Sequence, residues 1–154
     1  MNTWLFVGMM VASGLVMSFQ APINARLRGH VGTFESSLVS FSVGTALLVL
    51  VVALAGDGNL RELGKASWWQ FLGGAIGAIF VTTTLLAAPK ITVTGMLVAA
   101  LVGQMLGALL IDEFGFFGMP KRPIELTRVA GLGLLVVSVL LINWKKLVPA
   151  GDVK

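Results

Sequence analysis

Five long stretches without a charged residue divide the chain, and short polar segments separate them. They cover residues 1–25, 36–56, 66–89, 91–111 and 129–144. Crossing roughly 30 Å of hydrocarbon takes about 20 apolar residues at about 1.5 Å each. Four stretches are long enough for this, and the fifth can be extended backward if Arg128 snorkels its guanidinium to the interface. The pattern therefore predicts an all-α integral membrane protein with five transmembrane helices.

The polar segments set the expected ends of these helices within one domain, residues 1–154. We place the helices at residues 4–24, 33–54, 68–87, 92–111 and 128–144. Thr33 is the expected N-cap of the second helix, with Glu35 in its first turn. Trp68 and Trp69 are interfacial anchors before the third helix. Arg26, Arg28 and His30 are expected in the first loop, and the half-apolar segment 112–127 in the fourth.

Composition supports the membrane assignment and argues against catalysis. Hydrophobic residues make up 56% of the chain and charged residues 12%, with a mean hydropathy of +0.93. A soluble domain has about twice that charged fraction. The chain has no cysteine and one histidine, and no Ser-His-Asp set, metal-ligand cluster or phosphate loop is present. We expect no enzyme activity, cofactor or metal. The net charge of +4 indicates contact with lipid headgroups, not nucleic acid.

Basic residues are almost evenly divided between the two sides of the membrane. Five helices place Arg61, Lys65, Lys121, Arg122 and Arg128 on the side of the N-terminus. They place Arg26, Arg28, Lys90, Lys145, Lys146 and Lys154 on the other side. Most membrane proteins carry a clear excess on the cytoplasmic side. Five against six favours insertion in both orientations; the alternative is that the Lys145–Lys146 pair dominates and fixes one.

Small residues four positions apart predict close packing between helices. Such pairs or stripes are Gly14 with Ser18, Ser36 with Ser40 and Gly44, Gly73 with Gly77, and Gly103 with Gly107. Small residues at this spacing let helix backbones approach within a bilayer. Because five helices leave little room for a pathway inside one chain, we expect a dimer to supply the missing half.

Uncharged polar residues inside the apolar stretches are the candidate pathway residues. Gln20 and Asn24 share one helix face, and Pro22 between them is expected to break the helix. Gln104 lies near the middle of the fourth helix and Ser40 in the second. Interhelical hydrogen bonding is one interpretation of these residues. The other is a broken helix that lines a polar cavity, as at a transporter site.

Glu35 is the candidate for ion coupling. If it lies deep in the membrane, desolvation favours its protonated form and allows proton exchange or cation binding. The alternative is a carboxylate in the first helical turn at the membrane interface.

Six sequence blocks resemble a known family. They are FQAPINARL at 19–27, SFSVGT at 40–45, WWQFLGGAIGAIFV at 68–81, AAPKITVTG at 87–95, VGQMLGALLIDEFG at 102–115 and RVAGLGLLVVSVLLI at 128–142. Together they resemble the YdcZ-type, EamA-like inner-membrane exporter family of the drug/metabolite transporter superfamily. The resemblance implies a five-helix unit that corresponds to half of a ten-helix inverted-repeat transporter, in a bacterial inner membrane. It also implies pairing as homodimers, heterodimers or fused halves.

Two functions remain open on the sequence. The first is a secondary transporter or exporter of a small metabolite, which works as an antiparallel homodimer with a polar site at the dimer interface. The second is a non-transporting membrane subunit, or one half of a heterodimeric transporter. A neighbouring gene for a similar chain with opposite charge bias would favour the second.

Overall fold

The computed structural model describes residues 3–147, and this part of the chain consists of helices joined by turns and loops, with no strand. Five helical spans are long and apolar enough to cross a membrane: Thr3–Val31, Thr33–Ala55, Trp68–Ala87, Val93–Phe114 and Leu126–Trp144. The expectation of an all-α chain with five membrane-spanning helices is confirmed. The chain divides into two compact units, Met1–Lys90 and Ile91–Lys154. The expectation that all five spans form one domain stays a prediction.

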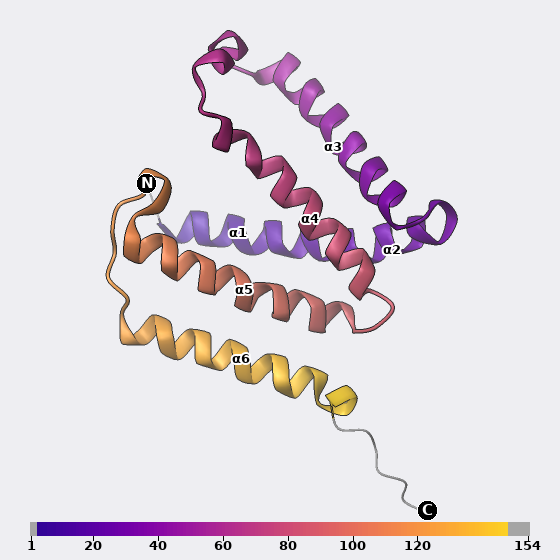
Figure 1. The fold of residues 1–154 in the computed structure, drawn as a ribbon, viewed down its shortest axis with the longest axis vertical. Coiled ribbons are helices and arrows are strands. Elements are labelled where there is room, and N and C mark those ends of the chain that lie inside the picture. Colours follow the sequence, from indigo (N-terminus) through magenta and orange to yellow (C-terminus); the bar gives the residue numbers. More distant parts are fainter. Residues whose placement is uncertain (1–2, 148–154) are drawn as a thin grey trace, which may run out of the picture. The chain divides into compact units, whose positions relative to one another are not determined.

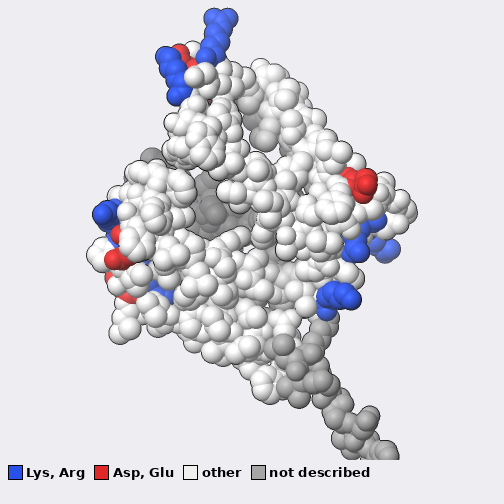
Figure 2. All heavy atoms as spheres, viewed as in Figure 1, with Lys and Arg blue, Asp and Glu red and all other residues white. Residues whose placement is uncertain are grey.

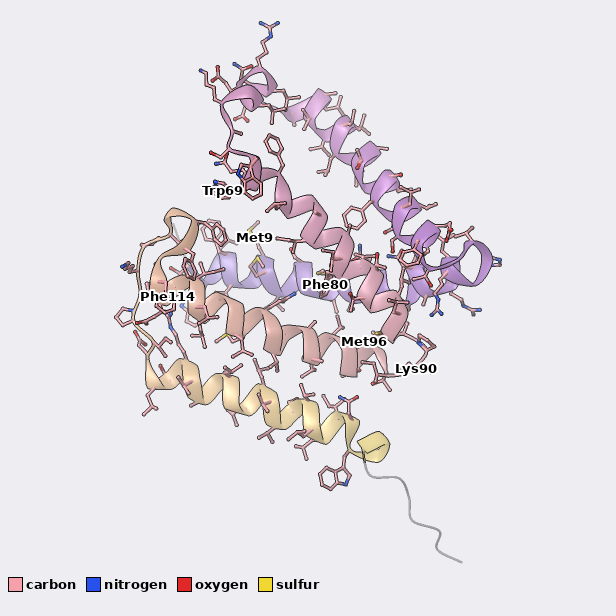
Figure 3. All side chains as sticks on the ribbon, viewed as in Figure 1. Met9, Trp69, Phe80, Lys90, Met96 and Phe114 are labelled. Carbon is pink, nitrogen blue, oxygen red and sulfur yellow. The ribbon has the colours of Figure 1, made fainter. Side chains whose placement is uncertain are left out.

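The first unit holds three spans built from four helices. These are α1 (Thr3–Ser18), α2 (Gln20–Val31), α3 (Thr33–Ala55) and α4 (Leu72–Ala87), and the last two run antiparallel (Figure 1). Two 3-10 turns, Leu60–Lys65 and Trp68–Phe71, join α3 to α4. Trp69 lies in the 3-10 turn just before α4, and Lys90 lies just past the end of α4 (Figure 3), so an aromatic and a basic residue flank this helix.

The second unit is a hairpin of two helices, α5 (Val93–Phe114) and α6 (Leu126–Leu147). Gly115, in the left-handed conformation with φ 66°, caps α5, and a 3-10 turn at Phe116–Gly118 follows. Phe114 ends α5 in Figure 3, and its ring lies 5.4 Å from that of Phe116. The helix therefore runs three residues beyond the expected end at residue 111, because Gly115 provides the stop signal instead of the first acidic residue.

Asp112 and Glu113, at the end of α5, hold the hairpin loop in place. Arg128 donates from Nη1 to Asp112 Oδ2 at 3.0 Å, and Ile124 N–H donates to Glu113 Oε2 at 2.7 Å. Carboxylates are unfavourable at a helix C-terminus, so these donors offset their charge. The fifth span begins at Leu126, before Arg128, and the Arg128 side chain has a carboxylate partner at the far end of the loop; that Arg128 reaches the membrane interface stays a prediction.

Gly95 of α5 packs closely against Asn143 of α6. A Cβ at Gly95 would lie 2.6 Å from Asn143 Oδ1, and Asn143 itself donates to the Val139 carbonyl at 2.9 Å. Thr92 caps α5 by accepting from Gly95 N–H at 3.1 Å. Glycine is therefore required at position 95 for α5 and α6 to approach each other. Gly95 is not a member of the predicted pairs of small residues four positions apart.

Most of the apolar surface of both units faces outward. No more than 17% of the residues in the most apolar stretch of any span is buried within the described part of the chain. Charged side chains gather over the helix ends, and uncharged surface covers the helix flanks between them (Figure 2). A soluble monomer rarely exposes this much contiguous apolar surface, so lipid or a partner chain covers it.

Candidate functional site

The buried core of the first unit lies where α2, the start of α3 and the end of α4 meet, and it is unusually polar. Its buried members are Ala21, Asn24, Ser36, Ser37, Val81 and Leu85. Ser36 is fully buried, and its hydroxyl donates to the Asn24 carbonyl at 2.9 Å. Small serines let the helices approach closely, and hydrogen bonds between helices satisfy their hydroxyls.

Asn24 is the centre of this polar contact. Its side chain is buried, with 5% of its surface exposed, and its Nδ2 donates to Ser40 Oγ at 3.1 Å. One turn earlier on α3, Ser36 bonds the Asn24 backbone. The predicted stripe of small residues therefore packs on α2 through Ser36 and Ser40, whereas Gly44 is exposed with no neighbour near its Cβ position. The amide of Asn24 and the hydroxyl of Ser40 are both uncharged, and they hydrogen-bond to each other without an ion between them.

An open pocket of about 460 Å³ lies along α2 and α3 beside this pair. Its polar lining comes from Gln20, Asn24 and Ser40. The apolar lining comes from Val16, Phe19, Ile23, Leu27, Val39 and Val43. Three of the four predicted pathway residues thus lie together, although sixteen residues separate Asn24 from Ser40. Apolar walls with a few converging polar groups are typical of small-molecule sites.

Gln20 lines two pockets. It closes the one shared with Asn24 and also borders a second, formed by Ala12, Ser13, Val16 and Met17 on α1. Its side chain is half-buried. The bend between α1 and α2 therefore places one amide between two openings on the same helical span.

The bend in the first span lies at Phe19, three residues before Pro22. Pro22 has no N–H to donate to the Ser18 carbonyl, so the helical ladder is interrupted one turn before it. Phe19 N–H bonds the Val16 carbonyl at 3.2 Å in a tighter turn, and Ile23 N–H returns to Phe19 at 3.2 Å. Phe19 keeps helical angles, φ −77° and ψ −21°. The span is bent and continuous, and Pro22 lies in the first turn of α2.

The first span also runs on to Val31, past the expected end at Asn24. Arg26, Arg28 and His30 are therefore helical, and the expectation that they lie in a loop is wrong. The helix stops at Gly32, whose φ of 100° favours glycine. Gly32 also occupies the N-cap of α3, so the expectation of Thr33 as N-cap is wrong. A charged residue does not mark the end of the helix here, because Arg28 forms a hydrogen bond with a partner inside the unit.

That partner is a carbonyl freed by a proline. Arg28 Nη1 donates to the Leu85 carbonyl at 2.9 Å, linking α2 to the end of α4. Residue 89 would normally donate to this carbonyl, but it is Pro89, which has no N–H. Ala88 N–H still bonds the Thr84 carbonyl at 2.9 Å, so the helix is regular up to this point. Leu85 is 1% exposed, and an unpaired carbonyl there would be costly.

A threonine of α4, Thr82, links this helix to α3. Thr82 donates from Oγ1 to Ser37 Oγ at 3.0 Å, across to α3, and Thr84 bonds the Phe80 carbonyl of its own helix at 2.9 Å. Of these two bonds, the one from Thr82 links two helices. A Cβ at Gly77 would lie 3.3 Å from the Phe41 ring, so the lack of a side chain at Gly77 also lets α3 pack closely on α4.

The other candidate residues do not join the pocket. Glu35 is exposed in the first turn of α3, and both interpretations of its depth in the membrane stay predictions. Gln104 is exposed on α5, in the second unit. Gly73, Gly103 and Gly107 have no neighbour near their Cβ positions in the described structure. Their roles in helix packing stay predictions that require a partner chain. Among residues 3–147, no group of three or more His, Asp or Glu residues converges on a metal site.

Two contacts that shape the units are absent from the sequence-based predictions. The first is the hydrogen bond from Arg28, a helical residue, to the Leu85 carbonyl. Pro89, which follows the third apolar helix, is visible in the sequence and indicates that a carbonyl one turn earlier lacks its helical donor. The second is the contact of Asn143, four residues before the end of α6, with Gly95. Neither pairing can be found from spacing, because 57 and 48 positions separate the partners.

Comparison with known proteins agrees with the architecture. The model of the family described as "Putative inner membrane exporter, YdcZ" matches residues 5–141. The inner membrane protein YdcZ of Escherichia coli (strain K12) is 25% identical over 147 residues, which cover 92% of this chain and 97% of that protein. No solved structure matches.

Proposed function

Because this chain belongs to the YdcZ family of inner membrane exporters, we propose that it is a secondary transporter of a small polar solute. The pathway runs along the α2–α3 face, with Gln20, Asn24 and Ser40 as its polar wall. The pocket they share carries this proposal. A multi-pass inner membrane protein has little reason to keep amides beside an open pocket unless water or solute reaches them.

The complete pathway requires a second copy in the opposite orientation. In the first unit the pocket is open along one side, and most apolar surface of the spans faces outward. The nearly even charge balance favours dual insertion. Leaving out Arg28 and Arg128, which have partners, keeps the balance nearly even, since they come from opposite sides. Two oppositely inserted chains would form an inverted repeat of ten helices, with the polar site at the interface between them. This assembly would place the chain in the drug/metabolite transporter superfamily.

Cysteine accessibility tests whether the pocket is a water-filled pathway. The chain has no cysteine, so single substitutions supply the only thiol. We expect Gln20→Cys and Ser40→Cys to react with a membrane-impermeant thiosulfonate reagent. Ser42→Cys is the matched control, because Ser42 is exposed two residues along α3 and does not line the pocket. Leu47→Cys reports a lipid-facing position of the same helix.

The readout is the second-order labelling rate in membrane vesicles. Pocket positions should react at least roughly tenfold faster than Leu47→Cys and Ser42→Cys, since thiolates form only in contact with water. Equal rates at all four positions would contradict a pathway on this face of α3.

A further inference from the structure

The Arg28 guanidinium has no acidic partner among the described residues, and Leu27, the residue before it, lines the pocket. Arg28 is half-buried. In the described structure its guanidinium makes one hydrogen bond, to the neutral carbonyl of Leu85. The ion pairs found within residues 3–147 are Lys65 with Glu62 and Arg128 with Asp112. Glu35, the acidic residue of the neighbouring helix α3, is exposed and bonded to no basic group there. A cation in a membrane span usually has an anionic partner or a functional role.

Arg28 continues the polar side of α2. Gln20, Asn24 and Arg28 are each four residues apart, so the three side chains follow one helix face. The first two line the pocket, and so does Leu27, the residue next to Arg28. From one end to the other, this face presents two amides and then a guanidinium.

The first span is also long enough to place Arg28 at a pathway entrance. Its 29 residues correspond to about 43 Å of helix, against roughly 30 Å of hydrocarbon. If the N-terminal end of the span starts at the interface, the last turns of α2 reach the headgroup level on the other side. A cation at that level is hydrated enough to exchange its partner, and Leu27, its neighbour in the sequence, lines the pocket.

We propose that Arg28 is the anion-recognition residue of this pathway, and that the transported solute carries an oxyanion, a carboxylate or a phosphate. The proposal rests on the transport function proposed above and names the chemical class of its solute. The Leu85 carbonyl uses one N–H of Nη1 and fixes the plane of the guanidinium. The Nε and Nη2 donors make no bond to any described residue, and together they match the two oxygens of a carboxylate or phosphate. The amides of Gln20 and Asn24 then accept and donate to the uncharged polar groups of the same solute.

Charged thiol reagents test this while the solute is unidentified. Leu27→Cys places the only thiol of the chain in the pocket beside Arg28. We expect a sulfonate-bearing thiosulfonate to react faster there than a trimethylammonium-bearing one. Arg28→Gln should lower this rate ratio by roughly fivefold or more, as expected when one unit charge within several ångströms is removed. The matched control is Arg26→Gln, which removes an exposed charge two residues away on the same helix and should leave the ratio unchanged.

Two further variants keep the test valid if Arg28→Gln disturbs folding. Arg28→Lys keeps the charge and should keep the ratio. Pro89→Ala restores an N–H to the Leu85 carbonyl, so Arg28→Gln can be measured in that background with the carbonyl satisfied. A ratio that Arg28→Gln leaves unchanged, or that Arg26→Gln lowers equally, overturns the proposal. Absence of labelling at both Leu27→Cys and Gln20→Cys would instead contradict the water-filled pathway itself.

The bilayer composition separates a dissolved solute from a lipid headgroup. In phosphatidylcholine vesicles, succinate or inorganic phosphate added to the buffer should slow the reaction of Leu27→Cys with the anionic reagent, and Arg28→Gln should remove this protection. If only phosphatidylglycerol in the bilayer protects the thiol and neither dissolved anion does, the oxyanion is a lipid headgroup and the solute assignment is overturned.

Discussion

Asn24→Leu is expected to reduce export strongly while leaving the protein folded. Leucine has the same branched arrangement of side-chain heavy atoms as asparagine, so most contacts of the buried site are kept and the amide is lost. Ser40 loses the donor at 3.1 Å, but a serine hydroxyl in a helix can bond the carbonyl one turn earlier. We therefore expect a stability cost of about 1 kcal/mol. Export should fall at least roughly tenfold, since the pocket loses its central polar group.

The measurement works on whatever solute the protein exports. Media from cells expressing the native chain and from cells with an empty vector are compared, and the solute that accumulates only with the chain is then followed for each variant. Size-exclusion chromatography of the purified variant checks its fold. Ser42→Ala is the control, because it removes an equivalent hydroxyl from the same helix outside the pocket. Native export by a well-folded Asn24→Leu protein would show that the Asn24–Ser40 pair only holds the helices together.

Arg28→Gln is expected to destabilise the first unit, and Pro89→Ala is expected to reverse most of that loss. The substitution removes the donor to the Leu85 carbonyl, which Pro89 leaves without its helical partner. An unsatisfied buried carbonyl costs about 1–3 kcal/mol. Alanine at position 89 supplies the missing N–H, and Ala88 has helical angles, φ −50° and ψ −38°, that direct residue 89 toward Leu85. The two effects should therefore be strongly non-additive.

Thermal unfolding of the native protein, the two single variants and the double variant in one detergent gives the complete cycle. We expect Arg28→Gln to be less destabilising in the Pro89→Ala background than in the native one. Arg26→Gln is again the control, and it should cost the same in both backgrounds. Equal costs of Arg28→Gln with and without Pro89 would mean that the proline-freed carbonyl is not what holds Arg28 in place.

The number of spans is predictable from sequence because the cost of placing charge in hydrocarbon acts on each stretch independently. The same rule fails at the end of the first span. Arg26 and Arg28 predict a loop by their charge, whereas the helix continues to Val31. Arg28 has a partner within the unit, a carbonyl 57 residues away in the chain. Interactions of this kind depend on how helices pack, which the local pattern does not encode.

The candidate site is predictable in part for a related reason. Gln20 and Asn24 can be identified because uncharged amides are costly in an apolar helix, and this cost can be seen in one segment alone. Their convergence with Ser40 follows from the short Gly32 connection between α2 and α3, which forces these two helices to be neighbours. Gln104 belongs to the second unit, and its place in a pathway stays a prediction.

The central claim is that one five-span chain supplies both halves of an exporter by inserting in two orientations. The most direct test is the location of the C-terminus. Lys154 is fused in parallel to a reporter active only in the cytoplasm and to one active only in the periplasm. We predict activity from both fusions, in comparable amounts. Shifting the charge balance, with Arg61 and Lys65 both replaced by glutamine, should bias the ratio toward the orientation that keeps the other side in the cytoplasm. Activity from one reporter alone would contradict dual insertion and would make this chain one half of a pair with a different, oppositely inserted partner.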